Sequence, residues 1–159
     1  MIVLNEILLD DVSAKAQEND RLRMNYNFHE QMEDKVHRML NALEPDTYIP
    51  PHRHKNPDRV ESFLLLRGKI AVFLFNDEGK IVEKVVLDPL QGNYGVDIPA
   101  GVWHGLVVLE KKSVIYEIKE GPYVSISQEN IAPWAPSLND QEAVNDFLEA
   151  LKAEASQTL

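Results

Sequence analysis

The sequence predicts an all-β fold, an antiparallel sandwich or barrel with a short N-terminal helix and a C-terminal helix. Short apolar stretches recur through the middle of the chain, and Gly, Pro, Asn and Asp residues separate them as turns. Strands that are short, evenly spaced and joined by such turns usually pair with antiparallel neighbours. The expected strands are residues 36–43, 61–67, 69–75, 81–87, 96–98, 103–109 and 113–119.

The N-terminal segment, residues 2–18, combines two patterns. Residues 2–4 are apolar and could pair as an edge strand. From residue 10 onward the chain has helix formers and an acidic start, which suits the positive N-terminus of a helix. Asn19 and Asp20 then end the predicted helix.

Residues 21–29 alternate polar and bulky side chains, which indicates an extended segment. Its polar face is either solvated or functional. The residues on that face are Arg23, Asn25, Asn27 and His29.

The predicted strands of the middle follow in order. Residues 36–43 favour a strand by their apolar content, although Leu and Ala also permit a helix. Residues 44–47 form a turn, and residues 48–49 lead into a strand that carries His52 and His54. A single glycine separates the strands at 61–67 and 69–75, and residues 76–80 have the composition of a hairpin turn.

The tail, residues 137–159, predicts a helix. Ser137 or Asn139 can cap it, and an apolar face repeats at helical spacing. That face consists of Val144, Phe147, Leu148 and Leu151. We expect it to pack on the outside of the barrel or on a partner subunit.

Composition excludes several classes of function. A net charge of −10 opposes binding to nucleic acid, because a phosphate backbone attracts a basic surface. No apolar run is long enough to cross a bilayer, and the first residues lack the pattern of a secretory signal. We therefore expect a cytoplasmic protein without a membrane partner. Cysteine is absent, so any metal must be bound by His, Asp or Glu.

The stretch around residues 51–61 has the composition of a metal site. His52 and His54 are two residues apart, so both imidazoles project from one face of an extended chain. Glu61 follows a loop-like insert, and residues 99–104 end in a third histidine, His104. Imidazoles with a carboxylate suit one divalent transition metal such as Fe, Mn, Ni, Zn or Cu. His29 and His37 lack such support and are expected to be structural or solvated, and Trp103 to face the core or form a pocket wall.

Both stretches resemble the paired motifs of the cupin superfamily, which are small β-barrels of the jelly-roll kind. His52, His54, Glu61 and Gly68 match the first motif, with six residues between the glutamate and the glycine. Residues 99–104 match the second motif, Pro-x-Gly-x-x-His. The resemblance implies that His52, His54, Glu61 and His104 are the metal ligands. The insert at 55–60 is longer than in most cupins, so Glu61 could be a ligand or, if displaced, a general base.

The sequence departs from the cupin pattern at both leading turn glycines, which are replaced by Asp46 and Asn93. Both residue types tolerate left-handed backbone, so the turns can be retained. We expect a single cupin domain over residues 1–159. Residues 1–45 would supply the N-terminal helix and leading strands, residues 46–124 the barrel core with both motifs, and residues 137–159 the C-terminal helix.

A more specific resemblance covers most of the chain and is to the WbuC family of bacterial cupin-fold metalloproteins. It is carried by residues 21–29, 48–54, 121–123 and 134–136. WbuC proteins are associated with O-antigen and other surface-polysaccharide biosynthesis, which implies a small, sugar-like ligand. We expect substrate contacts from Arg23, Asn25, His29, Arg38 and Tyr123.

Three functions remain open at the level of sequence. The first is a metal-dependent enzyme acting on a sugar or sugar-derived substrate, such as an isomerase or epimerase. The second is a non-catalytic sugar-binding or sensing protein with a structural metal. The third is an iron-dependent dioxygenase of a small organic acid. Exposed strand edges and a loosely held terminal helix also suggest a homodimer.

Overall fold

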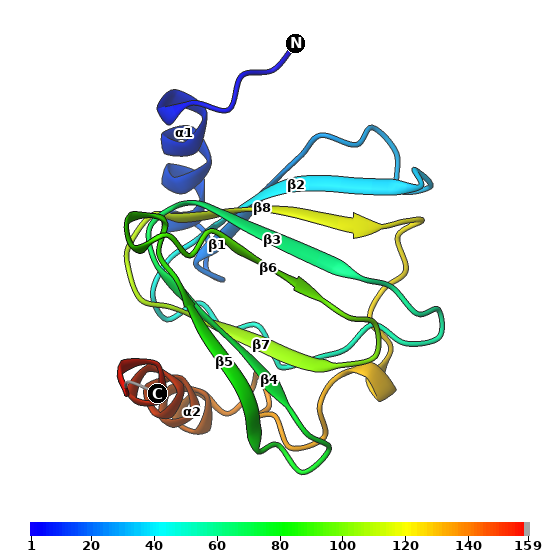
Figure 1. Cartoon of the computed structure of the whole chain (residues 1–159), viewed down its shortest axis with the longest axis vertical. Helices are drawn as coiled ribbons and strands as arrows, with labels where there is room; N and C mark the ends of the chain where they lie inside the picture. Colours follow the sequence, from blue (N-terminus) through cyan, green and yellow to red (C-terminus); the bar gives the residue numbers. More distant parts are fainter. Residues whose placement is uncertain (158–159) are drawn as a thin grey trace.

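Two antiparallel sheets face each other in the computed structural model, which describes residues 1–157 (Figure 1). One sheet has five strands in the order β1-β2-β8-β3-β6, and the other has three in the order β5-β4-β7. The strands are β1 (Arg23–Asn27), β2 (Val36–Leu43), β3 (Glu61–Arg67), β4 (Ile70–Phe75), β5 (Ile81–Leu87), β6 (Gly95–Ile98), β7 (Trp103–Val108) and β8 (Ser113–Glu120). This is the jelly-roll arrangement of cupins, so the predicted fold class is confirmed.

The main core lies between the two sheets. Alternate residues of each strand point inward and bury apolar side chains against the opposite sheet. The buried residues of this core are Leu43, Phe63, Leu65, Ile70, Val72, Leu87, Ile98, Leu106, Val108 and Ile115. At one end of the sandwich polar residues replace them, and this end contains the candidate site.

Two helices cover the outer faces of the sheets (Figure 1). Helix α1 (Glu6–Gln17) packs Leu9 and Val12 against β1 and β2, whereas α2 (Gln141–Ser156) packs Leu148 and Leu151 against the three-stranded sheet. The apolar face predicted for the C-terminal helix therefore covers the outside of the barrel. Two short 3₁₀ turns, η1 (Pro89–Gln91) and η2 (Gln128–Asn130), complete the elements.

The predicted edge strand at residues 2–4 is wrong. These residues are exposed and irregular, and α1 begins already at Glu6. Asn5 caps the helix, because its Oδ1 accepts a hydrogen bond from the Leu8 backbone N–H at 3.1 Å. The cap lets the helix begin just after the apolar stretch, and Leu9 of the helix is buried.

The predicted strand that leads into His52 and His54 is also absent from the described chain. Residues 48–54 are extended, but only His52 forms ladder contacts, with His104 and Ile131. Two consecutive prolines, Pro50 and Pro51, explain this, because a proline has no N–H to donate to a ladder.

The C-terminal helix begins later than predicted. Asp140, not Ser137 or Asn139, caps α2, and its Oδ1 accepts a hydrogen bond from the Ala143 backbone N–H at 3.1 Å. Ser137 and Asn139 lie in the preceding turn. The end of the predicted helix, residues 158–159, lies outside the described residues. Between residues 1 and 157, neither helix combines the length and the apolar character that a bilayer crossing requires.

Candidate metal centre

The structure brings His52, His54, Glu61 and His104 together at one end of the sandwich. Each offers one donor atom, and the four atoms all lie within 4.8 Å of one another. His54, Glu61 and His104 are buried, and His52 is half-buried. The insert at 55–60 therefore does not displace Glu61, which begins β3 and points into the cluster.

Backbone pairing holds the histidines in place. The N–H of His52 donates to the His104 carbonyl at 3.0 Å, and the N–H of His104 donates back to the His52 carbonyl at 2.9 Å. The N–H of Gly101 donates to the His54 carbonyl at 3.0 Å, with φ +76° at Gly101, a region that a side chain would disfavour. The glycine of the second motif thus connects the two histidine segments.

Backbone carbonyls also orient two of the imidazole rings. Nδ1 of His52 lies 3.0 Å from the Pro50 carbonyl, and Nδ1 of His104 lies 2.9 Å from the Val102 carbonyl. A carbonyl only accepts, so Nδ1 carries the hydrogen in each neutral ring. Nε2 is left with its lone pair, as a metal ligand requires, and a cation between His104 Nε2 and Glu61 Oε2 would satisfy both acceptors.

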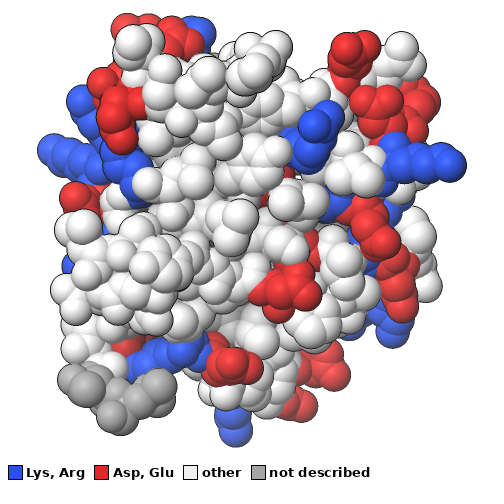
Figure 2. Space-filling model, turned by 45° about the horizontal axis from the view of Figure 1, so that its top comes forward, with Lys and Arg blue, Asp and Glu red and all other residues white. Residues whose placement is uncertain are grey.

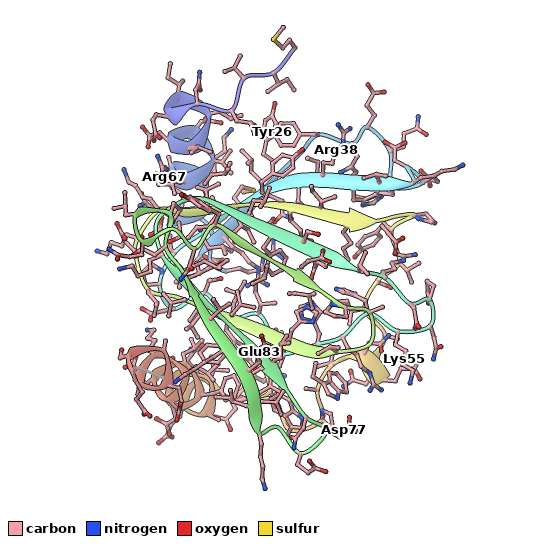
Figure 3. All side chains as sticks on the ribbon, viewed as in Figure 1. Tyr26, Arg38, Lys55, Arg67, Asp77 and Glu83 are labelled. Carbon is pink, nitrogen blue, oxygen red and sulfur yellow. The ribbon has the colours of Figure 1, made fainter. Side chains whose placement is uncertain are left out.

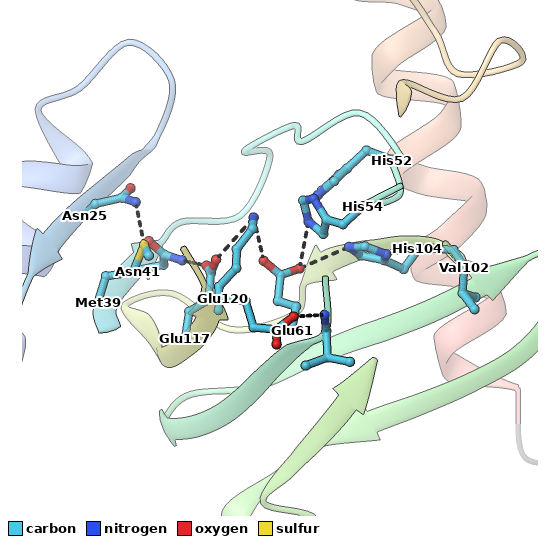
Figure 4. A network of polar contacts seen from close by, with 12 residues as sticks. Asn25, Met39, Asn41, His52, His54, Glu61, Val102, His104, Glu117 and Glu120 are labelled. Carbon is cyan, nitrogen blue, oxygen red and sulfur yellow. Dashed lines mark hydrogen bonds and ion pairs between the residues drawn. The ribbon is translucent and has the colours of Figure 1, made fainter. Parts of the chain in front are cut away.

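Glu61 is the centre of a charged network (Figure 4). Its Oε2 lies 3.1 Å from His104 Nε2 and 3.5 Å from His54 Nε2, and its Oε1 lies 3.0 Å from Lys119 Nζ. Burial by itself would raise the pKa of Glu61, but contacts with His104 and His54 and the Lys119 charge hold it well below the ordinary value. Glu61 is therefore a carboxylate at neutral pH.

The cluster passes a chemical test for a divalent transition metal. Nε2 of His54 is buried and has no hydrogen-bond partner among residues 1–157, which is costly unless something else occupies its lone pair. Burial, followed by the nearby His104, lowers the pKa of His52 to about 3, so this ring is neutral at pH 7. Imidazole nitrogens from three histidines and one carboxylate match the ligands that Fe, Mn, Ni and Zn accept.

A cavity of about 190 Å³ opens against His52, Glu61 and His104. Its wall combines apolar and polar side chains, which is common in small-molecule sites. The apolar residues include Leu43, Ile49, Phe63, Leu106, Ile115 and Ile126, and the polar residues include Arg23, Asn25, Asn41, Glu117 and Lys119.

Sequence reasoning missed Glu117 and Lys119, which face the cavity from β8. Lys119 Nζ lies 3.9 Å from Glu117 Oε1, and the Asn41 side-chain amide donates to the Glu117 carboxylate (Figure 4). Burial, and then the Glu61 charge, raise the pKa of Glu117 well above its ordinary value. Ser113, Ile115, Glu117 and Lys119 share the inward face of β8 by strict alternation. These two residues could have been found from the sequence, because charged residues on the core-facing side of an otherwise apolar strand indicate a functional site.

The family comparison matches residues 4–87 to the model described as "Domain of unknown function (DUF6016)". This range is a little more than half of the chain. The chain belongs to the DUF6016 family. The matched range contains His52, His54 and Glu61 and stops before His104. No protein with a curated description matches the sequence.

Solved structures with a similar fold have low sequence identity to this DUF6016 member. The protein TT1209 from Thermus thermophilus is 18% identical with a TM-score of 0.52, covering 76% of this chain and 97% of its own. KdgF from Halomonas sp. is 19% identical with a TM-score of 0.50, and the match covers 65% of this chain and 81% of KdgF. A cupin superfamily protein from Desulfitobacterium hafniense DCB-2 is 13% identical with a TM-score of 0.48, and the match covers 62% of this chain and 76% of that protein. At these identities the similarity concerns the fold alone.

The structure brings only some of the predicted substrate residues to the metal cavity. Arg23 and Asn25 line it, and Arg23 Nη1 is held by the Tyr48 carbonyl at 2.8 Å. His29 and Tyr123 line an adjoining cavity of about 230 Å³, which shares Asn25, Glu117, Lys119 and Ile126 with the first.

Arg38 does not reach either cavity. It lies on the outer face of β2, where Figure 3 places it near Tyr26 and outside the space between the sheets. Its Nη2 donates to the Phe28 carbonyl at 3.2 Å. Adjacent strand residues point to opposite faces, so His37 and Met39 face inward and Arg38 faces outward.

The remaining candidates have structural positions. The rings of His29 and His37 stack with centroids 4.0 Å apart, and both residues are buried rather than solvated. Trp103 faces the core beneath α2, and its Nε1 donates to Asp77 Oδ1 at 2.9 Å. The guanidinium of Arg53 covers the Trp103 ring at 4.1 Å.

Proposed function

We propose that this protein is a metal-dependent enzyme that acts on a small hydroxylated substrate. One observation carries the proposal: three of the four residues with converging donor atoms, His52, Glu61 and His104, line a cavity that also presents the polar side chains of Glu117, Lys119 and Asn41. A purely structural metal site is normally closed by protein on all sides. This cluster instead borders open space into which a ligand could enter.

His52, His54, Glu61 and His104 would hold the metal. A divalent transition metal at this position would act as a Lewis acid that polarises a hydroxyl or carbonyl oxygen. The chain's own residues have separate tasks. Lys119 holds Glu61 Oε1 at 3.0 Å, so Oε2 stays directed at the histidines.

The polar wall would orient the substrate. Asn41 and Glu117 from neighbouring strands and Asn25 from β1 offer donors and acceptors to hydroxyl groups. The apolar lining residues, which include Phe63 and Leu106, would exclude water and contact the carbon skeleton. Such a mixed lining suits a molecule with polar and apolar surfaces, as a sugar has.

We further propose that the substrate is sugar-derived and that the reaction belongs to surface-polysaccharide biosynthesis. The support is the resemblance of residues 21–29 and 48–54 to WbuC proteins, together with the polar groups of the cavity. An isomerase or epimerase reaction fits because both need a polarised oxygen and a nearby proton carrier.

The test is metal-dependent turnover. Metal-free protein is reloaded separately with Fe, Mn, Ni or Zn and incubated with free and nucleotide-linked sugars, and products are followed by NMR. The proposal expects turnover that requires the metal and is lost in Asn41→Leu, while Arg38→Ala, altered on the outer face of β2, keeps it. Saturable binding without turnover for every metal would favour the non-catalytic sugar-binding function instead, and oxygen consumption by the iron form would favour the dioxygenase.

A further inference from the structure

The insert before Glu61 buries a cation beside the metal cluster. Arg59 is 8% exposed, although arginine is rarely so buried unless it is paired. Its guanidinium makes no hydrogen bond and no ion pair with any residue between 1 and 157. Its nitrogens are not fully enclosed by protein, so the unpaired charge faces the adjoining hollows, where a counterion from outside the chain could bind it.

Arg59 lines two hollows that adjoin the metal cluster. One is the cavity of about 230 Å³ that shares Asn25, Glu117 and Lys119 with the metal cavity. The other, about 100 Å³, runs from Arg59 to Arg53 and to the ligand His54. The guanidinium is therefore connected to the metal centre on both sides through shared lining residues.

Three of the other charged groups around Arg59 make contacts of their own. Lys119 pairs with Glu61 at 3.0 Å, and the Glu120 carboxylate accepts a hydrogen bond from the Val60 backbone N–H at 3.3 Å. Arg53 stacks on an indole ring 4.1 Å away. Arg59 is the most buried cation that lines these hollows, and no counterion contacts it among residues 1–157.

We propose that Arg59 binds the carboxylate of an anionic, hydroxylated substrate whose other end faces the metal cluster. A guanidinium fork matches a carboxylate with two parallel hydrogen bonds. Glu120 lines the same hollow, and its negative charge disfavours a dianionic phosphate relative to a singly charged carboxylate. The orientation of the ligand rests on the proposed function, whereas anion binding at Arg59 does not.

The test uses three linear polyols that differ in charge: D-gluconate, neutral D-glucitol and D-glucitol 6-phosphate. Binding is measured by calorimetry on metal-free and metal-loaded protein. We expect gluconate to bind most tightly and Arg59→Met to weaken it about ten- to a hundredfold, the cost of losing a charged hydrogen-bonded pair. Arg59→Lys keeps the positive charge but lacks the two parallel donors of the guanidinium, so its affinity for gluconate should lie between those of the unaltered protein and Arg59→Met. Arg38→Ala, which removes an arginine on the outer face of β2, should bind as the unaltered protein does.

Stability provides a second readout that a structural role for Arg59 would move in the opposite direction. Removing an unpaired buried charge should leave the melting temperature of Arg59→Met unchanged or raise it, whereas loss of a structural contact would lower it. Equal affinity for gluconate and glucitol, no gluconate binding, tighter binding of the phosphate, or unaltered gluconate binding by Arg59→Met would each overturn the proposal. Gluconate binding that depends on Arg59 in a protein that takes up no metal would instead refute the proposed function and leave this inference standing.

Discussion

Replacing Lys119 with methionine tests the electrostatics of the site. The substitution keeps the apolar stem and removes an ammonium that lies 3.0 Å from Glu61 and 3.9 Å from Glu117. With an effective dielectric constant of about 20, the pair with Glu61 is worth roughly 5 kcal/mol before desolvation is subtracted, and Glu117, whose pKa is raised, adds little charge. Breaking a buried pair costs about 3–5 kcal/mol, and the Lys119 side chain is 22% exposed, so we expect a loss of about 2–3 kcal/mol.

The metal should reduce that loss. A cation bound by Glu61 and the histidines replaces part of the charge that Lys119 supplies, so the substitution should cost less in the loaded protein than in the metal-free protein. Urea unfolding with chelator and with added Zn or Mn gives both values. Lys69→Met is the matched control, because Lys69 pairs with Asp88 at 2.8 Å away from the cluster and should show no metal dependence. An equal loss with and without metal, or no loss, would refute the reasoning.

Two further predictions concern the scaffold. Gly68 and Gly92 have nearly the same φ, +85° and +86°, but a Cβ at Gly68 would lie 2.2 Å from Ser113 Oγ whereas a Cβ at Gly92 meets nothing within 4 Å. Gly92→Ala should therefore lower the free energy of unfolding by about 1 kcal/mol through backbone strain, and Gly68→Ala by about 2–3 kcal/mol because a clash is added. Urea unfolding measures both losses, and equal losses would contradict this reasoning. Burial raises the pKa of Tyr48 to about 12, and its hydroxyl donates to the Pro136 carbonyl at 2.9 Å. Since the unfolded tyrosine ionises near pH 10, the contribution of the buried, protonated Tyr48 to the free energy of unfolding is complete below pH 10 and falls by up to about 3 kcal/mol as the pH rises to 12. Tyr48→Phe should remove that part of the alkaline decline in stability.

The sequence predicts the sheets well because their signals are local. Alternating or continuous apolar stretches bounded by turns identify every strand from β2 to β8, and the six-residue spacing between Glu61 and Gly68 places both in the first motif. The predicted strand that leads into His52 is wrong, because two consecutive prolines prevent ladder pairing there. The start of α1 was misplaced for a similar reason, since Asn5 caps the helix and a short apolar run cannot distinguish a strand from a helix.

The candidate site was predictable where it follows a motif and less so where it depends on packing. The four metal donors are separated by up to 52 positions in sequence, yet their motif spacing indicates that they meet. Arg38 was expected at the substrate and lies on the opposite face of β2. Successive strand residues point to opposite faces, and the packing of the sheets decides which of the two faces turns inward. Glu117 and Arg59 were missed because their burial depends on the opposite sheet and on the fold of the 55–60 loop. On the face shown in Figure 2, both acidic and basic side chains occur, mainly around a central area of uncharged residues.

Metal content of purified protein tests the central claim most directly. Unaltered protein, reloaded and dialysed, is compared by elemental analysis with His52→Ala, His54→Ala and His104→Ala, and with His37→Ala as a control from the stacked pair outside the cluster. The account predicts about one divalent transition metal per chain in the unaltered protein and the control, and a large loss in the three ligand variants, with β-sheet circular dichroism retained. Full occupancy in the ligand variants, or no metal in the reloaded unaltered protein, would contradict it.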